Sequence, residues 1–302
     1  MEFDKRTIQM KRIFKFSVAD FLFGLLLPED YDIKKELVPL LPFYIEDTNT
    51  DFLFIIDCED RAKTPRESEQ KLLEESENDM GHICLMSDDN HFSVSFCQTP
   101  GGKEHLLCWD KMYTHIRAYL HWEDPYASRV LLSMVRVIFS QVILAENAVA
   151  LHASAVQLDG YAFLFMGRSG TGKSTHADLW RAHFPDCELI NDDNPILKIE
   201  KEQVWIYGSP WSGKRHCYRN VKYPVKGIVR LRQSPQNLFC EKNGVDAFLQ
   251  LLPGASVIKQ DKERYNALCG TLVRISTLVS VGVMECLPNQ EAAQICMDNL
   301  NK

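Results

Sequence analysis

The sequence lacks paired-cysteine motifs and long apolar runs. None of its ten cysteines forms a C-x-x-C pair, so neither a disulfide framework nor a zinc site is expected. Residues 21–27 are apolar but too few to cross a bilayer, and residues 130–144 are interrupted by polar side chains such as Arg136 and Gln141. We therefore expect the longer stretch to be a buried helix, and we expect no membrane partner.

An excess of positive charge is also missing. The chain has 34 Lys and Arg against 41 Asp and Glu, a formal net charge of −7, which argues against a nucleic-acid partner. The first six residues contain acidic side chains and no signal-peptide pattern, so a cytoplasmic location is expected. The 302 residues, 45% of them hydrophobic, suffice for one large domain or two of moderate size. A homo-oligomer is left open.

Residues 1–122 form the first predicted domain, which is β-rich. Its predicted strands are residues 11–18, 51–57, 83–86 and 92–96, with a further strand pair ending near Trp122. The highly charged residues 61–79 are interpreted as a solvated loop or an exposed helix. A role in substrate recognition is a hypothesis that rests only on the attachment of this region to the second domain.

Residues 123–302 form the second predicted domain, and strands alternate there with helices, which indicates an α/β fold. The predicted strands are residues 148–156, 161–166, 188–190, 204–207, 225–231 and 279–287, and helices are expected at residues 126–145, 246–252, 263–277 and 290–300. The turn at Leu158-Asp159-Gly160 predicts that the first two strands form a β-hairpin.

A phosphate-binding P-loop follows the strand at residues 161–166. The pattern G-x-x-x-x-G-K-[ST] lies between a buried strand and a helix, which is the setting it requires. Its glycines allow backbone N–H groups to point at phosphate oxygens, the lysine can reach the β- and γ-phosphates, and the serine hydroxyl can ligate Mg²⁺. The predicted nucleotide-binding residues are Gly167, Arg168, Ser169, Gly170, Thr171, Gly172, Lys173, Ser174 and Thr175.

Asp192 and Asp193 end the strand that follows the P-loop helix. An acidic residue at this place is what a Mg²⁺ ligand requires, because neighbouring parallel strands end at one edge of the sheet. One carboxylate could hold the metal and the other could accept a proton from a hydroxyl. The alternative is an Asx-rich turn, since Asn-Asp-Asp-Asn-Pro is also a good turn sequence.

Two further candidates lie near these residues in the predicted fold. His152 begins the hairpin strand, where it could tune a carboxylate or be a structural histidine. Residues 208–214 repeat the P-loop pattern, but Pro210 lacks an N–H and Trp211 is bulky, so a second nucleotide site is not expected. Lys214 and Arg215 could instead offset charge on a transferred phosphoryl group, with Trp211 packed over substrate, or form a solvated turn.

These residues together resemble the kinase domain of HPr kinase/phosphorylase, whose P-loop fold is related to that of phosphoenolpyruvate carboxykinase. The similarity covers about residues 126–235 and is greater to the bacterial HPr kinase-like proteins, which include peptide-tailoring kinases. The resemblance implies catalytic roles for His152, Lys173, Asp192 and Asp193, one aspartate being the general base for a seryl hydroxyl. The family's Glu-Ile-Arg-Gly signature has no equivalent here, and residues 1–125 do not match, which argues against HPr as the acceptor.

The sequence thus predicts an α/β fold with a P-loop kinase domain of HPr kinase/phosphoenolpyruvate carboxykinase type and a β-rich N-terminal domain. The expected function is ATP-dependent transfer of the γ-phosphoryl group to a serine of a protein or peptide. ATP and Mg²⁺ are the expected cofactors, with Ser174 and Asp192 as metal ligands, Asp193 as base, and Lys214 or Arg215 offsetting charge. The alternatives are a module that only binds or hydrolyses ATP or GTP and a carboxykinase-like small-molecule enzyme.

Overall fold

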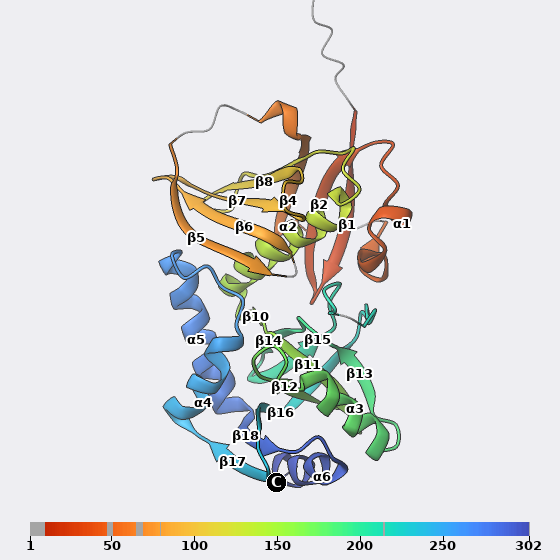
Figure 1. Ribbon diagram of the computed structural model, residues 1–302, viewed down its shortest axis with the longest axis vertical. Coiled ribbons are helices and arrows are strands. Elements are labelled where there is room, and N and C mark those ends of the chain that lie inside the picture. The colour runs from red at the N-terminus through yellow and green to blue at the C-terminus, as the bar shows by residue number, and fades with distance from the viewer. Residues whose placement is uncertain (1–9, 47–50, 65–68, 79, 214, 302) are drawn as a thin grey trace, which may run out of the picture. The chain divides into compact units, whose positions relative to one another are not determined.

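The chain divides into two compact units. The computed structural model describes residues 10–46, 51–64, 69–78, 80–213 and 215–301 (Figure 1). One unit extends to Ile138 and the other spans Phe139–Lys302. The division falls inside helix α2 (Ala127–Val142), on the C-terminal side of the boundary at residue 122 expected from the sequence.

The first unit consists mainly of strands. Its elements before α2 are β1 (Lys11–Val18), β2 (Phe21–Pro28), α1 (Ile33–Glu36), a 3-10 helix (Val38–Phe43), β3 (Tyr44–Ile45), β4 (Phe54–Asp60), a 3-10 turn (Arg61–Lys63), β5 (Lys71–Asn78), β6 (Gly81–Ser87), β7 (His91–Cys97), β8 (Glu104–Asp110) and β9 (Ile116–Leu120). They confirm the β-rich character expected of this region.

One mixed sheet contains all of these strands, in the order β3-β1-β2-β4-β9-β8-β7-β6-β5. β1 and β2 form a hairpin whose two turn residues, Ala19 and Asp20, have positive φ, as a tight hairpin turn requires. Phe16 lies opposite Phe23 across this hairpin, and both side chains are fully buried. β2, β4 and β9 pair in parallel, and β9 to β5 form an antiparallel meander.

The expectation for residues 61–79 was wrong for most of the described part of this segment. Lys71–Asn78 is strand β5, which pairs with β6 at the edge of the sheet. Its side chains are mostly exposed and its sequence is strongly charged, which hides a strand from a search for buried apolar alternation. Backbone pairing with β6, rather than burial, defines this strand.

The second unit alternates strands and helices. Its elements are a 3-10 turn (Ile143–Glu146), β10 (Ala148–Ala150), β11 (Ala153–Leu158), β12 (Tyr161–Met166), α3 (Lys173–His183), β13 (Glu188–Asn191), β14 (Ile196–Glu200), β15 (Gln203–Tyr207), β16 (Lys222–Gln233), β17 (Leu238–Lys242), α4 (Gly244–Leu251), a 3-10 turn (Leu252–Gly254), α5 (Lys262–Leu278), β18 (Ser280–Cys286) and α6 (Gln290–Leu300).

These strands form a second sheet in the order β10-β14-β15-β16-β12-β11-β13, with β18 paired to β16 and β17 paired to β18. Helices cover both faces of this second sheet (Figure 1). Alternate residues of β12 point to opposite faces. Phe163 and Phe165 belong to the apolar cluster that includes α3 and α6, whereas Leu164 and Met166 belong to the cluster that includes α4 and α5. A strand that is buried on both faces reads as one continuous apolar run, which is how residues 161–166 appear in the sequence.

The predicted hairpin is confirmed, since β11 and β12 pair from Ala153↔Met166 to Leu158↔Tyr161. The predicted strand at residues 148–156 is split. β10 pairs with β14, whereas β11 pairs with β12 and β13, and His152 lies at the break between them. β14 and β17 were not predicted.

The apolar helix is confirmed as α2. Helix α2 and the 3-10 turn that follows it together span Ala127–Glu146. Among the described residues, this is the one helical segment long and apolar enough to cross a membrane, and 67% of its most apolar part is buried inside the structure. This burial is what a core helix shows.

Candidate active site

The direction of the strands brings the predicted site residues to one edge of the second sheet. β12 and β13 both pair antiparallel with β11, so they run in the same direction and end at the same edge, where β11 begins. Gly167 follows the end of β12, Asp192 follows the end of β13, and His152 precedes β11. The backbone N–H of Ala153 donates to the carbonyl of Asp193 at 3.0 Å.

The glycine-rich loop joins β12 to α3. Gly172 caps α3 with a φ of 107°, a conformation that side chains with a Cβ rarely adopt. The Thr171 hydroxyl donates to the carbonyl of Arg168 at 2.7 Å and closes the loop. α3 begins at Lys173, so its N-terminal N–H groups and the positive end of its dipole lie at the loop.

The Lys173 side chain is buried over this loop. Its ammonium donates to the carbonyls of Gly167 at 3.2 Å and Arg168 at 3.4 Å. Burial lowers the pKa of Lys173, while the nearby Asp193 and Asp192 oppose that shift. Ser174 lies half-buried in the first turn of α3, and Thr175 is exposed beside it.

Asp192 is buried, with 3% of its side chain exposed. The Ser154 hydroxyl donates to Oδ1 of Asp192 at 2.6 Å, and Nε of Arg215 lies 3.5 Å from Oδ2. Sequence reasoning missed Ser154. Its alternation with Ala153 and Ala155 in the buried strand β11 was the available signal, because a polar side chain on a buried strand needs a partner.

Asp193 faces His152. The Asp193 Oδ1 atom lies 3.0 Å from Nδ1 of His152, with 15% and 41% of the two side chains exposed. Asn191 holds this turn, because its Oδ1 accepts hydrogen bonds from the backbone N–H groups of Asp193, at 2.9 Å, and Asn194, at 2.8 Å. The Asx turn considered as an alternative is therefore present, and it is the scaffold that holds the two carboxylates.

Arg215 connects the segment after β15 to α3. Its guanidinium donates through two nitrogens to the Asp178 carboxylate, one of the bonds being 2.7 Å long, and it also contacts Asp192. The hydrogen bond with Asp178 raises the pKa of Arg215. Lys214, the other predicted basic residue, lies outside the described residues.

Residues 208–213 form a packed turn against the aspartate pair. A Cβ on Gly208 would lie 1.9 Å from the carbonyl oxygen of Arg219, so only glycine fits there. The expectation that Trp211 packs over a substrate was wrong, because Trp211 is buried with its ring 5.2 Å from that of Phe139. A Cβ on Gly213 would lie 3.5 Å from Cβ of Asp193, which places this turn directly beside the carboxylates.

A cluster of arginines lies near the loop. β16 runs parallel to β12, and Arg230 is the partner of Met166, the residue before the loop. Burial, Arg232 and Arg168 lower the pKa of Arg230. Sequence reasoning missed Arg230 and Arg232, since nothing in the local pattern shows that β16 lies beside β12. Nη1 of Arg230 donates to the carbonyl of Gln250 at 3.0 Å, and the positive charges of these arginines would attract an anion to this end of β12.

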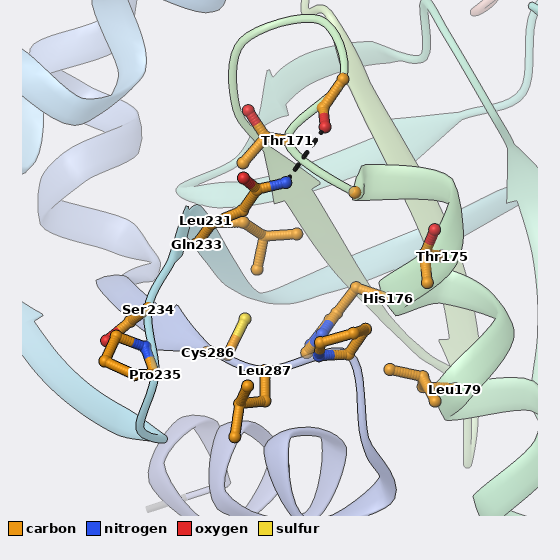
Figure 2. Close-up of a pocket in the computed structure, with 13 residues that line it drawn as sticks. Thr171, Thr175, His176, Leu179, Leu231, Gln233, Ser234, Pro235, Cys286 and Leu287 are labelled. Carbon is orange, nitrogen blue, oxygen red and sulfur yellow. Dashed lines mark hydrogen bonds between the residues drawn. The ribbon is translucent and has the colours of Figure 1, made fainter.

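A pocket of about 670 Å³ opens beside the loop and the first turns of α3 (Figure 2). Leu179, Leu231 and Leu287 make its walls apolar, and the hydroxyls of Thr171 and Thr175 lie at the loop side. Its other described lining residues are Gly170, Gly172, His176, Gln233, Ser234, Pro235, Cys286 and Pro288.

Two hydrogen bonds hold side chains that line this pocket in place. Gln233 donates from Nε2 to the carbonyl of Gly170 at 3.3 Å, the dashed line in Figure 2. His176 accepts a hydrogen bond from Nε1 of Trp180 at 3.1 Å. Burial lowers the pKa of His176 to about 4, so the imidazole is neutral at pH 7. The pocket therefore combines neutral walls with a polar side at the loop.

The residues around the aspartate pair fit a hard divalent cation. Carboxylate and hydroxyl oxygens are the ligands that Mg²⁺ prefers, and Asp192, Asp193 and Ser174 supply them. Asn194, which follows the pair, has a buried Oδ1 atom without a partner in the structure. This acceptor could take a hydrogen bond from a further donor, such as a water bound to the cation.

No protein-family model matches the chain, and no curated protein matches it either. Among solved structures, the chain is similar to the HPr(Ser) kinase/phosphatase from Coxiella burnetii, with 13% sequence identity and a TM-score of 0.30. The match covers 50% of this chain and 93% of that structure. At this identity and TM-score the likeness is distant and concerns the fold alone.

Proposed function

We propose that the protein is an ATP- and Mg²⁺-dependent phosphotransferase that moves the γ-phosphoryl group to a serine hydroxyl of a protein or peptide. One observation carries the proposal. Three separate segments, the loop with Lys173, the turn with Asp192 and Asp193, and the residue His152, meet at one edge of the sheet. A loop that only bound phosphate would not need a paired carboxylate and histidine beside it.

The phosphates would bind at the loop and the N-terminus of α3. Loop N–H groups and the helix dipole attract anions there. The Lys173 ammonium is buried and now donates to loop carbonyls, and a phosphate oxygen would give it a charged partner. Arg168 and Arg230 add positive charge at the same edge.

Ser174 and Asp192 would hold Mg²⁺. When bound there, Mg²⁺ would offset the negative charge on the β- and γ-phosphate oxygens. Asp192 suits this role because its carboxylate is almost fully buried and held by Ser154 and Arg215. Arg215 is itself tied to Asp178, so it would keep Asp192 in place rather than move to the phosphoryl group.

Asp193 would be the general base. It is the more exposed of the two carboxylates, and its contact with His152 orients it. Asp193 would take the proton of the acceptor hydroxyl while the hydroxyl oxygen bonds to the γ-phosphorus and the bond from that phosphorus to the bridging oxygen of ADP breaks. This assignment makes His152 a residue that positions the base.

The pocket beside α3 would hold the nucleoside. It borders Thr171 and Thr175 at the loop, and its apolar walls suit the faces of a purine. We further propose that the protein has no nucleic-acid or membrane partner, because the chain carries a net charge of −7. We also propose a cytoplasmic location, where its ten free cysteines would stay reduced.

Transfer of label from γ-labelled ATP tests the reaction. The full chain is incubated with Mg²⁺, labelled ATP and a pool of serine-containing peptides, with the same peptides carrying alanine as the control. Label on serine is expected. Asp193→Asn should lower the rate about 10²- to 10⁴-fold because the base is lost, while Asp186→Asn, at an exposed position after α3, should not.

Release of free phosphate alone, with none of the serine peptides labelled, would contradict transfer to serine and favour a hydrolase. An unchanged transfer rate in Asp193→Asn would contradict the role of Asp193.

A further inference from the structure

A cluster of metal-ligating side chains lies in the first unit, far in the chain from the residues of the candidate active site. Glu75 is on the edge strand β5, and His82 and Cys84 are on β6. Their ligand atoms all lie within 4.8 Å of one another. Nε2 of His82 is 2.7 Å from Oε1 of Glu75 and 4.0 Å from Sγ of Cys84.

The register of the sheet places these three side chains on one face. His82 and Cys84 are two residues apart, so they point to the same side of β6. Glu75 lies directly opposite Cys84 across the β5–β6 pair. Because the strands hold all three Cβ positions, a small adjustment of the side chains brings their ligand atoms to one point.

We infer that Glu75, His82 and Cys84 form a binding site for a Zn²⁺-like divalent cation. Thiolate, imidazole and carboxylate are the three ligand types that Zn²⁺ takes in proteins. Around a tetrahedral Zn²⁺ the ligand atoms lie roughly 3.3–3.7 Å apart, which falls between the 2.7 Å and 4.0 Å of the two contacts in the structure.

The fourth position of this site is open to water. Cys97 lies opposite His82 on the neighbouring strand β7, but its Sγ donates to the carbonyl of Thr99 at 3.1 Å. About half of the Glu75 and His82 side chains is exposed, so a solvent molecule can complete the tetrahedron.

The charges around the cluster favour a cation. Burial and the carboxylates of Glu75 and Glu104 raise the pKa of the Cys84 thiol. Binding of Zn²⁺ to the thiolate would release the thiol proton to solvent. A site with one thiolate and one carboxylate neutralises a divalent ion.

This proposal differs from the expectation, drawn from the sequence, that the protein has no zinc site. That expectation depended on the missing C-x-x-C pattern, in which two ligands come from a single turn of the chain. Here two ligands alternate along a strand and the third comes from the strand beside it, so their proximity depends on the pairing of β5 with β6.

Co²⁺ is the probe for this site, because a thiolate bound to Co²⁺ gives a charge-transfer absorption that oxygen ligands do not give. The full chain, reduced and stripped of metal, is titrated with Co²⁺ in excess Mg²⁺, which occupies the oxygen site of the second unit. A thiolate band that saturates at one Co²⁺ and is displaced by Zn²⁺ is expected. Cys84→Ser should lose it, and His82→Ala should bind about tenfold or more weakly.

Cys97→Ser is the matched control, since it removes a thiol from the adjacent strand and should keep the band. Absence of a thiolate band in the wild type, or an equal band in Cys84→Ser, would overturn the site, as would loss of the band in Cys97→Ser. Thermal unfolding separates ligand loss from misfolding. Without metal, the variants should have the same Tm as the wild type. Zn²⁺ should raise the Tm of the wild type but not that of Cys84→Ser.

Discussion

His176 connects the stability of α3 to pH. Its side chain is buried between Phe165 and Trp180, and it accepts the indole N–H of Trp180. Protonation of the accepting nitrogen would break that hydrogen bond and bury a charge, which is why burial lowers the pKa of His176 to about 4.

Stability should therefore fall as the pH falls from about 6.5 to about 4. Over this range the unfolded chain binds a proton at His176 and the folded chain does not, so acid favours unfolding. His176→Gln keeps an acceptor for Trp180 but does not titrate, so its urea stability should depend less on pH than that of the wild type. His183→Gln, farther along the same helix, is the control. An equal pH dependence in His176→Gln and the wild type would contradict this role.

At the scale of residues, the sequence could predict candidate site residues that lie together in one short segment of the chain. The loop from Gly167 to Thr175 and the pair Asp192–Asp193 are each one short segment with a local chemical reason. Ser154 and Arg230 could not be found in this way. Ser154 lies 38 residues from Asp192, its partner, and Arg230 reaches the loop only because β16 pairs with β12.

At the scale of elements, the turn after β15 positions the aspartate pair through its backbone. The Ser209 hydroxyl is fully buried and donates to the carbonyl of Asn194 at 2.7 Å, and the Asn191 amide donates to Ser209 Oγ at 3.1 Å. Gly208 begins this turn against the backbone of Arg219. The turn that resembles a second P-loop therefore supports the turn that carries Asp192 and Asp193.

Gly208→Ala should destabilise the protein by at least about 2 kcal/mol, because the new methyl group meets a backbone oxygen that cannot rotate away. Gly270→Ala is the matched control, since a Cβ at Gly270 in α5 meets no atom within 4 Å. That change should stabilise the protein by up to about 1 kcal/mol through higher helix propensity. Urea denaturation measures both, and equal stabilities of the two variants would contradict the packing of this turn.

Elements with strong apolar patterns were predictable, and elements defined by pairing were not. β12 and α6 match the ranges expected from periodicity, whereas β5 was missed because its side chains are charged and exposed. The break at His152 was also missed. Apart from Ser154, the residues on either side of His152 in the range 148–156 are apolar. Only pairing with different neighbours separates β10 from β11.

At the scale of the whole molecule, the two units carry different chemistry. The candidate active site is made by residues of the second unit, and the candidate zinc site is made by residues of the first. The sequence predicted a β-rich region followed by an α/β region but not the parallel pairing of β2, β4 and β9, because each of these pairs joins strands that a local pattern cannot connect.

Calorimetric titration of the full chain with a non-hydrolysable ATP analogue and Mg²⁺ tests the central proposal most directly. We expect the wild type and Asp193→Asn to bind with similar affinity, because Asp193 acts on the acceptor. Lys173→Ala should lose binding, because the β- and γ-phosphates lose their charged partner. Unchanged affinity in Lys173→Ala would contradict nucleotide binding at the loop from Gly167 to Ser174.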